Sequence, residues 1–248
     1  MGTVMRRTVC KFTAFAFLVA ANLTLSSCGL EEYIYLYPPN SPVFTDSETL
    51  QFSNNVGNGA IPEFQGYKIL YKFYKSAGNA EFDRSRISGY AAKDASVTYK
   101  YMKDDLKYNE IRFDQENSLA IPGVGDRSEE FTLEISFANP DSKVAIYYSA
   151  GSISKTVVFT VGITDDPSTS AEVSRIAGTS LGFASANLSV NSTDMLVTQI
   201  DEVLKKTYLQ CYVLSFGLSI TSSYTGEVYS QPQAFIGGIE NVVELDVN

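Results

Sequence analysis

Alternation of apolar and polar residues is the dominant pattern of the chain, and it is clearest over residues 64–75. One face of this stretch carries Tyr67, Ile69, Tyr71 and Phe73, and the other carries Lys68, Leu70, Lys72 and Tyr74. Successive side chains of a strand point to opposite faces. The stretch therefore predicts a strand with one buried aromatic face and one mostly cationic face open to solvent, as in a half-exposed antiparallel sheet.

Shorter runs of strand-favouring residues recur along the chain, separated by turn residues. They cover residues 50–53, 97–101, 109–113, 131–137, 144–148, 155–161 and 208–214. Between them, residues 54–60 predict a turn, 79–93 a loop and 165–170 a linker-like break. Residues 193–206 predict either a capped short helix or a strand. Short strands at regular spacing predict an all-β chain of the sandwich or barrel kind.

The N-terminal segment departs from this pattern. Arg6, Arg7 and Lys11 precede an apolar run over residues 12–25. That run is shorter than the roughly 20 residues that a membrane-spanning helix needs. It has the length of the apolar region in a secretory signal peptide, which follows a basic start.

The end of this run resembles the lipobox of bacterial lipoprotein signal peptides, with Leu25, Ser26, Ser27 and Cys28 in its four positions. The resemblance implies that residues 1–27 are removed and that the Cys28 thiol receives a lipid whose acyl chains include palmitate. Two or more acyl chains give stable membrane anchoring. In enterobacteria-like sorting, an Asp after the cysteine retains such lipoproteins in the inner membrane. Gly29 stands there in this sequence, so the resemblance implies the outer membrane. The alternatives are a core helix, or an ordinary secretory signal, that happens to contain a cysteine.

Residues 33–37 follow this predicted anchor and alternate three tyrosines, Tyr33, Tyr35 and Tyr37, with Ile34 and Leu36. The alternation predicts a short strand that ends at Pro38-Pro39. The preferred interpretation is a first strand with both faces covered. The alternative is an aromatic contact surface near the membrane.

Three segments resemble strands of fibronectin type III domains. Residues 66–72 resemble the central strand of that family, residues 208–217 its penultimate strand, and residues 229–232 the start of its last strand. The resemblance implies an all-β, antiparallel Ig/fibronectin III-like β-sandwich behind an N-terminal signal helix. Because the first two segments lie about 130 residues apart, the chain holds either one sandwich with a large insertion or two sandwiches. The expected domains are a signal peptide (1–27), a lipidated tether and first strand (28–41) and a sandwich region (42–248), with any division near 164–180.

Charge and cysteine content narrow the range of functions. Without residues 1–27 the chain has 16 Lys and Arg against 28 Asp and Glu, a net charge of −12. This balance argues against nucleic acid as a partner. With Cys10 removed and Cys28 lipidated, only Cys211 remains, in an apolar run that predicts a buried thiol. The chain contains no His, which removes the usual general base and the usual metal ligand.

Acidic pairs are the remaining candidates for chemistry. They are Asp104-Asp105, Glu129-Glu130, Asp165-Asp166 and Asp201-Glu202. Calcium binds loop carboxylates, so Asp165 and Asp166 in the linker-like break are weak metal candidates, although solvated acids are the preferred interpretation. No cofactor is expected. A glycan hydrolase would require two carboxyl groups that converge in the fold.

These observations favour a lipid-anchored, non-catalytic binding module of the cell envelope, held at the outer membrane or cell surface. Its partners would be the membrane, through the lipid on Cys28, and a protein or glycan ligand. The alternatives are an envelope hydrolase that uses a carboxylate pair, and a structural or assembly protein of the envelope.

Overall fold

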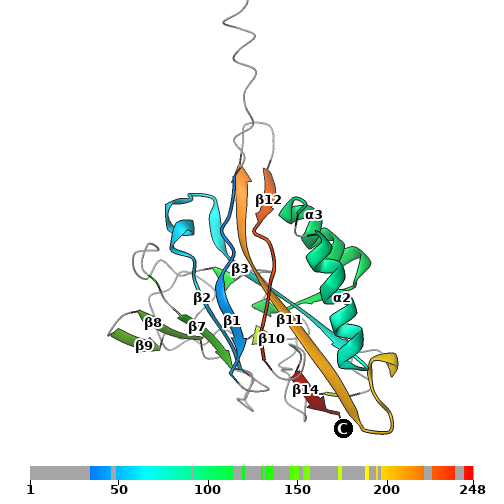
Figure 1. Cartoon of the computed structure of the whole chain (residues 1–248). Coiled ribbons are helices and arrows are strands. Elements are labelled where there is room, and N and C mark those ends of the chain that lie inside the picture. The colour runs from blue at the N-terminus through cyan, green and yellow to red at the C-terminus, as the bar shows by residue number, and fades with distance from the viewer. Residues whose placement is uncertain are drawn as a thin grey trace, which may run out of the picture. The chain divides into compact units, whose positions relative to one another are not determined.

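Two antiparallel sheets carry most of the regular structure in the computed structural model of the chain (Figure 1). The structure describes residues 34–45, 49–90, 92–113, 119–120, 130, 132–136, 146–150, 153–156, 173–174, 188–189, 194, 197–220, 225–237 and 243–247. All of these except Ile34 belong to one compact unit, residues 35–248. No helix in these ranges is long and apolar enough to cross a bilayer.

The first sheet has five strands in the order β1-β2-β7-β8-β9. Their bounds are β1 Asn40–Phe44, β2 Thr49–Ser53, β7 Thr132–Ser136, β8 Ile146–Ala150 and β9 Ile153–Thr156. All neighbours in this sheet are antiparallel.

The second sheet is built on β11, which spans Lys206–Ile220. Along one edge β11 pairs with β3 (Phe64–Tyr74), from Tyr208 opposite Tyr74 to Gly217 opposite Phe64. It also pairs with β14 (Val243–Asp246), β13 (Gln233–Ala234) and β12 (Thr225–Tyr229) at successive stretches of its length. The short strands β4 (Asn109–Glu110) and β6 (Leu119–Ala120) pair with β3. Strands β5 (Arg112–Phe113) and β10 (Val173–Ser174) form a separate pair.

An aromatic core lies between the two sheets. The Phe52 ring on β2 meets Tyr67 on β3 edge-on, with ring centroids 4.9 Å apart, and Phe235 packs against both Phe52 and Phe44. The sheets also join directly, because Phe44 N–H donates to the Ile236 carbonyl and Ile236 N–H donates to the Pro42 carbonyl, each at 2.9 Å. The sequence-predicted apolar face of β3 is therefore the inner face of a two-sheet packing.

Helices cover the other face of the second sheet. They are α2 (Ala77–Tyr90), α3 (Ala95–Lys100) and the π-helical turn η2 (Tyr101–Asp105). Ala80 and Ile87 of α2 and Met102 of η2 pack on Leu70, Leu214 and other buried residues of β3 and β11. Figure 1 shows α2 and α3 alongside β11 and β12.

The helical layer corrects three sequence predictions. Residues 79–93 are not a loop but mostly α2, whose buried positions Ala80, Asp83 and Ile87 lie on one helical face. Residues 97–101 are not a strand but lie in α3 and η2, behind an N-cap in which the Asp94 carboxylate accepts from Ser96 N–H. The cationic face of β3 is consequently not open to solvent, and Lys68 is only 3% exposed.

Most strand predictions agree with the structure. Strand β3 matches its predicted range, and β2, β7, β8 and β11 overlap theirs. Residues 54–60 form a turn that includes the 3-10 helix η1, Val56–Ala60. The described part of residues 193–206 holds the 3-10 turn η4 (Val197–Gln199) and a tight turn in which Asp201 bridges to Lys206, the first residue of β11. The mostly antiparallel β architecture is thus confirmed, with a helical layer that the sequence did not predict.

Candidate functional site

The predicted anchor and metal residues lie outside the described residues. This holds for Leu25, Ser26, Ser27 and Cys28 and for Asp165 and Asp166. Cys211 is described: it is a free, fully buried cysteine on β11, as the sequence predicted. Burial raises the pKa of its thiol well above the usual value, so the thiol is held in its protonated, unreactive form.

The acidic pairs that the structure describes are surface features. Asp104 and Asp105 are exposed on η2. The Asp201 carboxylate accepts hydrogen bonds from the Leu204 and Val203 amides, which form a turn and hold the pKa of Asp201 below its usual value. Within the described ranges, no group of three or more acidic or cysteine residues is placed to hold a metal ion.

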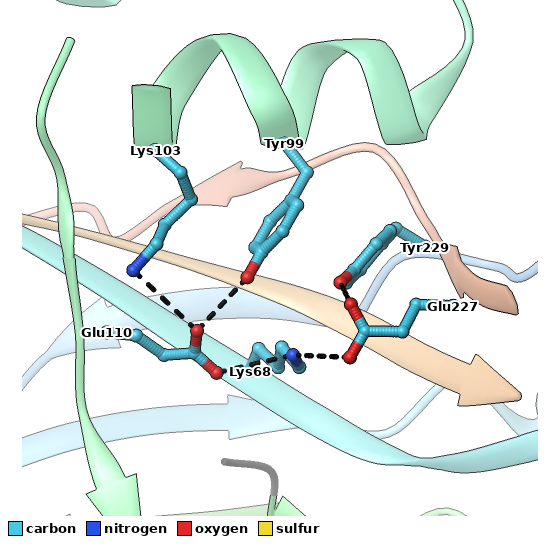
Figure 2. Close-up of polar contacts among 6 residues, drawn as sticks. All are labelled: Lys68, Tyr99, Lys103, Glu110, Glu227 and Tyr229. Carbon is cyan, nitrogen blue, oxygen red and sulfur yellow. Dashed lines mark hydrogen bonds and ion pairs between the residues drawn. The ribbon is translucent and has the colours of Figure 1, made fainter. Parts of the chain in front are cut away.

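A buried charged cluster surrounds Lys68, between β3 and the helical layer (Figure 2). The Lys68 ammonium lies 3.2 Å from a Glu227 carboxylate oxygen and 3.5 Å from Glu110 Oε1. The contact with Glu227 is a hydrogen bond, whereas Glu110 Oε1 accepts none, and its contact with Lys68 is an ion pair. Two carboxylates from different strands therefore converge on one buried cation.

Aromatic rings complete the surroundings of this ammonium. Lys68 Nζ lies 4.5 Å from the ring centroid of Phe216 and 5.5 Å from those of Tyr99 and Tyr229. Tyr99 and Tyr229 stack on one another with centroids 4.1 Å apart. Ring faces attract cations, so the rings and the carboxylates together replace the water that Lys68 loses on burial. We call these residues, with Lys103, the Lys68 cage: Lys68, Tyr99, Lys103, Glu110, Phe216, Glu227 and Tyr229.

The hydroxyl groups of the cage hold the carboxylates in position. Tyr99 donates to Glu110 at 3.1 Å, Lys103 lies 3.8 Å from the same carboxylate, and Tyr229 donates to Glu227. Burial is the first cause that raises the pKa of Tyr99 and of Tyr229, and the neighbouring glutamates raise both further. Both hydroxyls therefore stay protonated and act as donors.

The cage is a balanced network that ties the helices to the sheet. It has two cations and two carboxylates, and it joins β3, β4, β11 and β12 to α3 and η2. In a carboxylate-based glycosidase the space between two acids receives the sugar or a water molecule. Here the Lys68 ammonium occupies that space, so the geometry favours a structural role for Glu110 and Glu227.

A second buried polar chain lies beside the cage. Lys72 donates to Asp83 of α2 at 2.7 Å, Tyr74 donates to the same carboxylate, and the Tyr74 and Tyr108 hydroxyls are 2.7 Å apart. Tyr108 in turn donates to Gln210 of β11 at 2.7 Å. Burial raises the pKa of Tyr74 and of Tyr108, which keeps this chain uncharged apart from the Lys72–Asp83 pair. This chain also links α2 to both central strands.

An exposed aromatic segment lies at the N-terminal start of the folded unit. Residues 34–39 form no strand. Tyr35 is 54% exposed and Tyr37 43% exposed, whereas Leu36 between them is fully buried. The two tyrosine rings meet edge-on with centroids 5.2 Å apart. The prediction of a strand with both faces covered is therefore wrong, and the tyrosines face outward.

Side chains hold this segment where strand pairing would otherwise do so. The buried Asn58 amide accepts from Tyr37 N–H and donates to the Tyr37 carbonyl, each at 2.8 Å. Ser215 of β11 also donates to that carbonyl, at 2.6 Å, and Asn55 donates to the Pro38 carbonyl. The backbone of Tyr37 is consequently fixed while its ring stays exposed.

Gly57 gives the Tyr37 ring its position. A Cβ atom at Gly57 would lie 2.8 Å from the ring, closer than side-chain atoms pack. The neighbouring Val56 is 46% exposed. We call Tyr35, Tyr37 and Val56 together the tether-root face, because the chain leads from here towards Cys28.

Sequence reasoning did not find the Lys68 cage. Its members extend from residue 68 to residue 229, which are 161 positions apart in the sequence, and their convergence depends on the helices. The usable signal was the N-cap residue Asp94 before residues 95–100. The pair of hydrogen bonds from Asn58 to the Tyr37 backbone, which we call the Asn58 clamp, gave no sequence signal beyond an Asn-Gly turn.

The chain matches no protein-family model, and the comparisons with curated proteins and with solved structures gave no match.

Proposed function

We propose that this protein is a lipid-anchored, non-catalytic binding domain of the cell envelope, held at the outer membrane or cell surface by a lipid on Cys28. The observation that carries the proposal is the spacing between Cys28 and the folded unit, which begins at Tyr35. Seven residue steps separate the two, a reach of at most about 25 Å. A short tether between the lipobox and the folded unit supports a domain that is held close to the membrane by its lipid.

The proposed scaffold is a fibronectin type III-like sandwich with insertions. The strand orders β1-β2-β7 and β4-β3-β11-β12 correspond to the A-B-E and C′-C-F-G orders of such sandwiches. In this assignment the helical layer is an insertion between strands C and C′. The two segments that resemble the family's central and penultimate strands, β3 and β11, are adjacent in one sheet, which supports one sandwich with insertions over two.

A binding role fits the way the described polar groups are used. The Lys68 ammonium lies between Glu110 and Glu227, and Asp83 is paired with Lys72. Exposed aromatic and aliphatic side chains supply contact area for a protein or glycan partner.

Protease digestion of intact cells distinguishes an external from a periplasmic partner, since only a domain on the outer face would be cut.

Metabolic labelling tests the anchor. Cells grown with labelled palmitate should incorporate the label into the wild-type protein, and Cys28→Ala should abolish it because the lipid acceptor is lost. Cys10→Ala and Cys211→Ala are matched controls that should keep the label, since one residue lies in the removed leader and the other is buried. An unlabelled wild-type protein would refute the anchor.

A further inference from the structure

We propose that the tether-root face, Tyr35, Tyr37 and Val56, rests in the interfacial layer of the same bilayer that holds the lipid on Cys28. This inference depends on the proposed anchor and adds to it a defined face of the domain that meets the membrane. The domain would then be oriented at the surface and would not swing freely on its tether.

The first argument is reach. Tyr35 follows Cys28 by seven residues, so its backbone lies within about 25 Å of the lipidated sulfur even when the tether is fully extended. The polar headgroup layer occupies several ångströms on each side of a hydrocarbon core that is about 30 Å thick. Tyr35 is therefore the first residue of the folded unit after the anchor, and the interfacial layer lies within its reach.

The second argument is that these side chains are exposed although their backbone is held. Asn58 and Ser215 fix the Tyr37 backbone, Gly57 leaves room for its ring, and Leu36 is buried between the two tyrosines. Tyrosine has an apolar ring and a polar hydroxyl, and such side chains concentrate at membrane interfaces. A fixed, outward-facing tyrosine pair beside an exposed valine has the composition of an interfacial contact.

The third argument concerns the kind of contact. Residues 29–67 contain five acids, Glu31, Glu32, Asp46, Glu48 and Glu63, and no Lys or Arg. Attraction of basic residues to anionic lipid cannot hold this part of the chain at a membrane. Aromatic and apolar insertion is the remaining contribution, so the contact should be stronger on zwitterionic than on anionic bilayers at low salt.

The chain offers a matched control at the other end of β11. Val203 is 91% exposed and lies just before Lys206, where β11 begins, whereas Ser215 near the opposite end of the strand binds Tyr37. At about 3.4 Å per residue the strand separates the two positions by roughly 30 Å. A probe at residue 203 reports domain proximity to the membrane without reporting the tether-root face.

The absence of Trp from the sequence makes the experiment specific. Tyr35→Trp and Val203→Trp each introduce a single tryptophan at an exposed position. Each lipidated full-length protein is purified and reconstituted in phosphatidylcholine vesicles with or without lipids brominated near the headgroup. Trp at position 35 should lose emission to the brominated lipid and shift to shorter wavelength, while Trp at position 203 should do neither. Vesicles containing phosphatidylglycerol at low salt should reduce the loss at position 35.

Two failures are distinguishable. If both proteins float with the vesicles and carry the lipid label but Trp at position 35 is unquenched, the tether-root face does not contact the bilayer and the inference is overturned while the anchor stands. Equal quenching at positions 35 and 203 would also overturn it. If neither protein carries the label or floats, the anchor itself fails. Circular dichroism equal to that of the wild type establishes that each variant is folded.

Discussion

Lys68 is a buried cation whose stability depends on every partner around it. An isolated ammonium in an apolar interior is strongly disfavoured, and only close carboxylates and ring faces offset that cost. Glu110 is nearly buried as well, while Glu227 is half exposed. Removal of Lys68 or Glu110 should therefore destabilise the folded protein more than removal of one member of a surface ion pair.

We expect Lys68→Met to lower the free energy of unfolding by about 3–5 kcal/mol, because it leaves the Glu110 carboxylate without its buried partner. Glu110→Gln should lower it as well, and the double variant should lose less than the sum of the two single losses, since neither member of this buried pair is then left charged opposite an uncharged partner. Urea denaturation of the four proteins measures the coupling.

A surface pair is the control for this cycle. Lys206 and Glu244 form an ion pair in which about a third of each side chain is exposed. Lys206→Met should leave the urea midpoint almost unchanged, because exposed ion pairs contribute little to stability. Equal losses for Lys68→Met and Lys206→Met would contradict the account of the cage.

Side chains also stabilise the segment 34–39, which pairs with no strand. Asn58 supplies both the acceptor and the donor that a neighbouring strand would give to Tyr37. A buried peptide group that loses its partner costs roughly 1–3 kcal/mol. Removal of this one amide is therefore expected to loosen the segment 34–39, while Ser215 still donates to the Tyr37 carbonyl.

Asn58→Ala should speed hydrogen exchange of the Tyr37 amide and lower the free energy of unfolding by about 1–3 kcal/mol. Asn79→Ala is the matched control: Asn79 is exposed on α2, and alanine favours helix, so stability should hold or rise slightly. Exchange mass spectrometry of peptides that contain residues 34–39 checks the result. Unchanged protection in Asn58→Ala would show that the clamp is dispensable.

Elements with strict alternation were predictable, and elements that depend on tertiary contacts were not. β3 and β7 have large apolar residues at every second position, which only a strand places on one face. The helix α2 has only Ala80, Asp83 and Ile87 buried and includes Gly78, Asn79 and Gly89, so its sequence is typical of a loop. In α3 the β-branched residues Val97 and Thr98 favour a strand by propensity, and packing on β12 overrides that preference.

The faces of elements were less predictable than the elements themselves. Alternation separates the residues of β3 into two sets, but it does not reveal what covers each set. If the helices are not foreseen, the face of β3 that carries Lys68 and Lys72 is expected to be exposed to solvent. The same gap left Tyr35 and Tyr37 with two interpretations, because a period of two is compatible with buried or exposed rings.

For the whole molecule, buried tyrosines and the thiol of Cys211 predict a loss of stability at alkaline pH. Burial raises the pKa of Tyr67, Tyr74, Tyr99, Tyr108, Tyr212, Tyr229 and Cys211 in the folded protein. In the unfolded chain a tyrosine releases its proton near pH 10 and a cysteine near about pH 8.5. Below the pKa values of the unfolded chain, these groups are protonated in both states and their burial contributes its full stabilisation. Above those pKa values the free energy of unfolding falls as pH rises, because the folded state then binds more protons than the unfolded state.

The urea midpoint should therefore be constant near neutral pH and decline steeply above about pH 10. Tyrosinate absorbance checks the cause: with 16 Tyr and no Trp, one group of tyrosines should ionise without a change in circular dichroism, and the rest only together with unfolding. Ionisation of all tyrosines in a protein that keeps its folded spectrum would contradict the prediction.

The pairing of β3 with β11 also determines when this chain can fold. Residues 64–74 must find residues 208–217, and closing so long a loop costs conformational entropy before any ladder bond is gained. Topologies dominated by such distant pairings fold slowly. Because the ladder reaches Gly217 of β11, the central sheet and the helices that pack on it cannot be completed until that residue has been synthesised. A chain that is exported through a membrane would thus remain in a state fit for transport until its C-terminal strands arrive on the far side.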